Sequence, residues 1–75
     1  MTSQGGGRTG QTVTQLAVHR LKAIRRRRGL SAPQLAARCA QLGAPEISAN
    51  VVANIESGRR QVNLDQLAVL ALALD

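Results

Sequence analysis

The segment from Ala49 to Arg60, ANVVANIESGRR, combines amide and guanidinium side chains on one short helical pattern. Asn50 and Asn54 are four residues apart, so in a helix their amide groups share a face. An asparagine amide can donate to N7 of adenine and accept from N6, which makes a two-point contact to one base. The alternative interpretation is that both amides are only solvated polar groups.

Basic residues follow this short helix at once. Arg59 and Arg60 come directly after Gly58, and Asn63 stands three residues further along. The guanidinium fork matches phosphate oxygens well, and such contacts set position and affinity without reading sequence. Arg38, on the preceding helical pattern, is a further candidate phosphate ligand. For Arg38, Arg59 and Arg60, and for the arginines at 26–28, the alternative is a solvated charge.

The remaining reactive residue types do not form a catalytic or metal-binding pattern. Cys39 and His19 each stand alone, so neither has partners at metal-ligand spacing. The chain has no nucleophile with an adjacent base and no paired carboxylates, and the GGG at 5–7 lacks the spacing of a phosphate loop. We therefore expect no enzyme activity, no cofactor and no metal.

Composition narrows the class of protein. The 75 residues carry ten Lys and Arg against four Asp and Glu, a net charge of +6, which suggests a polyanionic partner, either nucleic acid or an acidic membrane surface. Aromatic residues are absent, so Leu, Ile, Val and Ala must form the core, and these favour helices. No apolar run is long enough to span a bilayer and no signal peptide is visible, which fits a cytoplasmic protein.

Capping signals divide the chain into four expected helices, at about 13–28, 32–42, 49–56 and 64–74. Each start carries a Ser, Thr or Asn that can cap the helix. Three of these residues have a Gln three positions later, which makes a capping box: Thr12 with Gln15, Ser31 with Gln34, and Asn63 with Gln66. Ser48 is expected to cap the third helix alone. Residues 12–75 are expected to form one domain. Residues 1–11 are predicted to be a flexible arm, with entry of Arg8 into a DNA minor groove as the alternative.

Apolar spacing predicts which side of each helix faces the core. The residues expected to face the core are Leu16, Ala17, Leu21, Ile24, then Leu35, Ala36, Cys39, Leu42, and then Val52 and Ile55. The apolar residues of the last helix include Leu64, Leu67, Ala68, Ala71, Leu72 and Leu74. Because Val69 and Leu70 occupy its other sides, the last helix is apolar almost all round. Such a helix needs cover on most faces, from further chain or from a second subunit.

Two motifs, GLS…QLA at 29–36 and IE-x-G-RR at 55–60, give the chain a family resemblance. From Leu21 onward the sequence resembles the Xre and phage-repressor-like helix-turn-helix family. The resemblance implies an all-α, lambda-repressor-like bundle of four short helices, with a fifth in longer members. Here the link between the second and third helices is longer than the usual three or four residues.

The resemblance also implies roles for particular residues. Positions 49–56 would be the recognition helix, with bases read or flanked by Ser48, Ala49, Asn50 and Asn54, while Ala49 or Val51 could meet a thymine methyl. Phosphates would be contacted by Arg38, Arg59, Arg60 and Asn63. Arg25 and Glu56 would form an ion pair between the first and third helices, a structural role.

The function implied is sequence-specific binding of double-stranded DNA by a bacterial transcriptional regulator, such as a repressor, acting as a homodimer on the nucleoid in the cytoplasm. The alternative is a protein-interaction module, an antitoxin or adaptor, whose working surface is the last helix. A third interpretation, a basic amphipathic anchor on anionic lipid, fits three capped helices in one domain less well.

Overall fold

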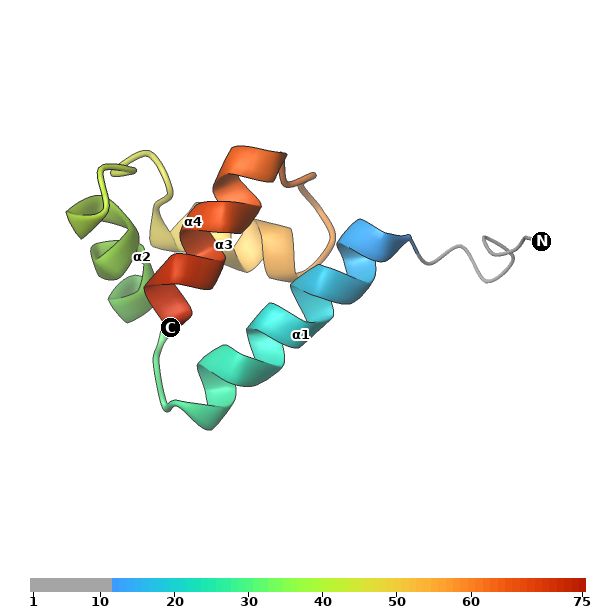
Figure 1. Ribbon diagram of the computed structural model, residues 1–75, viewed down its shortest axis with the longest axis horizontal. Helices are drawn as coiled ribbons and strands as arrows, with labels where there is room; N and C mark the ends of the chain where they lie inside the picture. Colours follow the sequence, from blue (N-terminus) through green and yellow to red (C-terminus); the bar gives the residue numbers. More distant parts are fainter. Residues whose placement is uncertain (1–11) are drawn as a thin grey trace.

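The computed structural model describes residues 12–75, which form four α-helices and no strand (Figure 1). The helices are α1 (Val13–Arg27), α2 (Ala32–Gln41), α3 (Ala49–Glu56) and α4 (Leu64–Leu74). This confirms the expected all-helical bundle, with α1 and α2 each ending one residue earlier than predicted. The predicted flexible arm at 1–11, with Arg8, lies outside the described residues.

Local side-chain caps start all four helices as the sequence predicts. Thr12, Ser31 and Asn63 each form a complete capping box with the Gln three residues later. At α3, the hydroxyl of Ser48 accepts a hydrogen bond from the backbone N–H of Val51 at 3.2 Å. These caps satisfy backbone donors that would otherwise have no partner, so each helix has a defined first residue.

The core is contributed by all four helices and by the link between α2 and α3. Its buried residues are Val18, Leu35, Cys39, Ala44, Ile47, Val52, Ile55, Leu70, Ala73 and Leu74. Ile47 of the link is only 1% exposed, and its N–H donates to the carbonyl of Ala44 at 3.2 Å. The N–H of Ala44 in turn donates to the carbonyl of Cys39 at 3.0 Å. The long link is therefore packed into the core, and it holds α3 against α2.

Two predicted core residues are wrong. Leu16 of α1 is 47% exposed, and Val18 is buried in its place. Two residues of helix turn the side chain by about 200°, so when Val18 points inward Leu16 must point outward. Leu42 is 50% exposed because α2 has already ended and Leu42 serves as its C-cap.

Only some of the apolar residues of α4 face the core. Leu70, Ala73 and Leu74 are buried, whereas Leu64 and Leu72 are 80% and 64% exposed. Ala68 and Ala71 are exposed as well. Because α4 is apolar almost all round, its sequence contains no amphipathic signal, and its orientation depends on how it packs against α1 and α2.

Candidate nucleic-acid interface

Helix α3 has a buried side and a more exposed side. Val52 and Ile55 are 1% and 3% exposed and anchor the helix to the core. Asn50 lies on the opposite side and is exposed, and Asn54, one turn later, is half-buried. Neither amide side chain has a hydrogen-bond partner among the described residues. Two amide groups are thus presented outward by a helix whose other side is immobilised.

The other residues predicted to contact bases lie at the start of α3. The hydroxyl oxygen of Ser48 accepts one hydrogen bond as the N-cap, which leaves its O–H donor and a second lone pair for other partners. Ala49 is half-buried. Val51 is half-buried too and packs against the core, on the flank of α3 between the amides and the buried side. Asn50 and Asn54 therefore share the outer side of α3, and Val51 lies at the edge of that side.

The turn after α3 places two arginines next to this amide face. Gly58 adopts a left-handed conformation with φ of 81°, which lets the chain reverse directly at the helix end. The backbone N–H groups of Arg59 and Arg60 then donate to the carbonyl of Asn54 at 3.0 and 3.2 Å. Both arginines are exposed. They are held close to the C-terminal end of α3 by backbone bonds, with their side chains directed to solvent.

The two remaining phosphate candidates sit at opposite ends of α4. Asn63 caps its N-terminus, where Oδ1 accepts from the N–H of Gln66 at 2.7 Å. Arg38, from α2, donates through Nη1 to the carbonyl of Ala73 at 3.0 Å, close to the C-terminus. Eleven helical residues, about 16 Å, separate the two ends. Asn63 thus lies beside the arginine turn, whereas Arg38 lies away from it.

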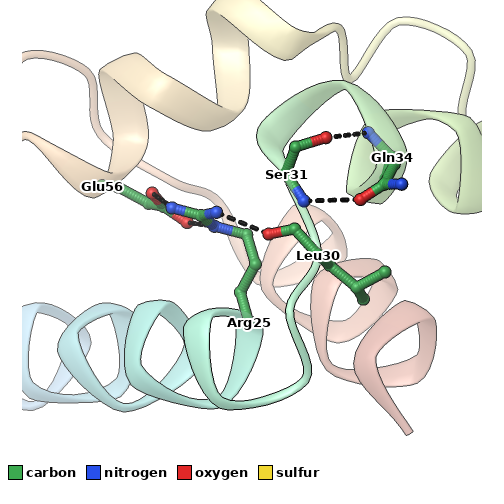
Figure 2. A network of polar contacts seen from close by, with 5 residues as sticks. All are labelled: Arg25, Leu30, Ser31, Gln34 and Glu56. Atoms are coloured by element: carbon green, nitrogen blue, oxygen red, sulfur yellow. Dashed lines mark hydrogen bonds and ion pairs between the residues drawn. The ribbon is translucent and has the colours of Figure 1, made fainter.

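Arg25 and Glu56 form the ion pair that the resemblance implied, and Figure 2 shows Arg25 reaching from α1 to Glu56. Arg25 Nε donates to Oε2 at 2.7 Å and Nη2 donates to Oε1 at 2.8 Å, a bidentate arrangement. Nη1 donates to the carbonyl of Leu30 at 2.7 Å. The hydrogen bond to Glu56 raises the pKa of Arg25, although partial burial acts in the opposite direction. One guanidinium therefore ties α1, the start of α2 and the end of α3 together.

An open groove of about 870 Å³ was not anticipated from the sequence. It runs between the start of α1 and the loop after α3, and its polar lining includes Thr14, Gln15, His19, Arg60 and Gln61. The two walls are at least 36 residues apart in the chain, from His19 to Ile55, so no local pattern could have indicated the groove. Arg60 belongs both to this groove and to the arginine turn, so the groove extends the polar surface beside α3.

Within the part of the chain that the structure describes, no cluster of three or more His, Cys, Asp or Glu residues could hold a metal ion. None of the helices at 12–75 is long and apolar enough to cross a bilayer. The thiol of Cys39 is fully buried, and burial raises its pKa, with the charge of Glu46 acting in the same direction. Cys39 therefore behaves as a small core residue.

Comparison with known proteins agrees with this geometry. Residues 15–75 match the model of a protein family described as a helix-turn-helix domain. This motif joins two helices by a turn and offers the second one to the major groove of DNA. A search of curated proteins found no match. A search of solved structures found none either.

Proposed function

Since this chain belongs to the helix-turn-helix domain family, we propose that it binds double-stranded DNA sequence-specifically, as part of a bacterial transcriptional regulator, with α3 in the major groove. The observation that carries the proposal is the two-sided character of α3. Its inner side is fixed by Val52 and Ile55, and its outer side presents two amides beside two arginines. A groove about 12 Å wide accepts one such helix.

The base-reading role belongs chiefly to Asn50 and Asn54. Each amide suits a bidentate contact with adenine, and a good contact of this kind discriminates by about 1–3 kcal/mol. Ala49 would meet a thymine methyl, with Ser48 flanking, and Val51 would contribute through the part of its surface that the core leaves open.

Affinity comes from the arginine turn. Arg59 and Arg60 are exposed, and Asn63 begins the next helix. These groups would contact the sugar-phosphate backbone on one side of the inserted helix. Arg38 would contribute at the edge of the surface, through guanidinium donors other than the Nη1 that binds Ala73.

We further propose that two copies act together on half-sites about 34–36 Å apart. The exposed stripe of α4, formed by Leu64, Ala68, Ala71 and Leu72, supplies an apolar surface for that contact. The same stripe favours the second candidate function, a protein-interaction module such as an antitoxin or adaptor. A partner from cell extract that stays bound after nuclease treatment would support the module, and loss of the partner would support DNA binding.

The test is selection of binding sites from a random duplex library, followed by affinity measurements over a range of salt. Recovered sites with dyad symmetry would support both site-specific binding and a dimer. Asn50→Ala should reduce the preference for the selected site, while Arg59→Ala should weaken binding to all sequences and lower the salt slope by about 0.9. A site preference that survives Asn50→Ala unchanged would refute the base-reading assignment.

A further inference from the structure

Helix α1 concentrates positive charge on a surface that the proposed function does not use. Six of the ten Lys and Arg residues lie in α1 or at its C-cap, and none of the four Asp and Glu residues does. Glu56 neutralises Arg25. The other five, which no ion pair within residues 12–75 compensates, are Arg20, Lys22, Arg26, Arg27 and Arg28.

The helix dipole explains only part of this distribution. Cations are favoured in the last turn of a helix, where Arg26 and Arg27 lie. Arg20 lies two turns earlier, in the middle of α1, where the dipole effect has faded. Its exposed charge has no ion-pair partner among the described residues, so it is free to meet an external anion.

Helical geometry pairs Arg20 with Arg27 on the outer side of α1. Val18 is buried and Arg25 reaches Glu56, so these two residues, seven apart, define the inner side. Arg20 follows Val18 by two residues, and Arg27 follows Arg25 by two. Because two residues of helix turn the side chain by about 200°, Arg20 and Arg27 lie on the outer side. Both are exposed, and their positions are about 10 Å apart along the helix axis.

This outer side and the amide side of α3 point in opposite directions. The ion pair of Arg25 and Glu56 lies between the two helices, so their core-facing sides are turned toward each other (Figure 2). The amides of Asn50 and Asn54 are directed away from the core on α3, and Arg20 and Arg27 are directed away from it on α1. A duplex held by α3 therefore leaves the outer side of α1 open.

We propose that the outer side of α1, centred on Arg20 and Arg27, binds the phosphate backbone of a second DNA duplex, so that the protein bridges two segments. The inference rests on the proposed DNA binding by α3. Guanidinium groups suit phosphate, and duplex DNA presents one charge per about 1.7 Å of its axis, so a pair of arginines finds partners without a defined register. Because these contacts reach no base edge, the second duplex is held without sequence preference.

A capture assay tests this. A biotinylated duplex carrying the selected site is fixed on beads and saturated with the full chain, and a fluorescent duplex of unrelated sequence is added after washing. The wild type should retain the second duplex. Arg20→Gln/Arg27→Gln should bind the first duplex within about twofold of wild type but capture the second on the order of tenfold less well, since two phosphate contacts are lost.

A charge-matched control separates the two surfaces. Arg59→Gln/Arg60→Gln removes the same charge from the α3 side, so it should need more protein to load the first duplex but then capture the second normally. Equal capture by the wild type and Arg20→Gln/Arg27→Gln would overturn the bridging proposal, as would wild-type protein that binds the first duplex and never the second. Failure to bind the first duplex at all would instead refute the proposed function. If anionic vesicles are bound through Arg20 and Arg27 while a second duplex is not, the face is a lipid site and bridging is wrong.

Discussion

Glu56→Gln tests whether the ion pair with Arg25 holds α3 in place. The two side chains are 13% and 12% exposed, so solvent screens them little. Breaking a buried pair costs about 3–5 kcal/mol, and a hydrogen bond to a charged group is worth about 1.5–3 kcal/mol. A glutamine keeps one oxygen acceptor, and Arg25 keeps its bond to the carbonyl of Leu30. We therefore expect a loss of about 2–3 kcal/mol in the free energy of unfolding.

That loss is large for this chain, because domains of this size have a total stability of only about 4–10 kcal/mol. Urea unfolding followed by far-UV circular dichroism measures it, since the chain has no Trp, Tyr or Phe for fluorescence. Glu46→Gln is the matched control, because Glu46 is exposed and has no ion pair among residues 12–75. It should change stability by less than about 0.5 kcal/mol. If Glu56→Gln costs no more than this control, the pair does not fix α3.

Three further changes have expected outcomes. Ser31→Ala removes the capping box of α2 and should lower the unfolding free energy by about 1 kcal/mol; an unchanged melting temperature would show that the cap is dispensable. Gly58→Ala should lower the free energy of unfolding by about 1 kcal/mol, measured by circular dichroism. The whole loss comes from the φ of 81°, since a Cβ there meets no atom within 4 Å, and equal stability would mean that the turn relaxes freely. Burial raises the pKa of Cys39, so the thiol loses its proton at a lower pH in the unfolded chain than in the folded one. The free energy of unfolding should therefore fall as pH rises above about 8.5, and this fall should be absent in Cys39→Ala.

The parts of the fold that depend on neighbouring residues were predictable from the sequence. The capping boxes at Thr12, Ser31 and Asn63 involve residues three apart, and each one starts a helix as predicted. The inner side of α3 was also predicted correctly, because Val52 and Ile55 stand out in a helix whose other side is polar.

The parts that depend on distant packing were not predictable. Leu16 and Val18 are both apolar, and only the contact of α1 with α3 and α4 decides which one is buried. Helix α4 offers apolar residues on every side, so its exposed stripe follows from tertiary packing alone. In the same way, the bond of Arg38 to Ala73 joins residues 35 apart, and no local pattern indicates it.

The central proposal is that residues 48–57 lie in the major groove of a duplex while the arginines beside them contact its strands. Isotope-labelled protein titrated with a selected duplex tests it, with the backbone amide signals followed by NMR. Signals from Ser48 to Ser57 should shift most, and those of Arg59 and Arg60 should shift with them. If the signals of residues 48–57 stay in place while those of other helices move, α3 is not the DNA-reading helix.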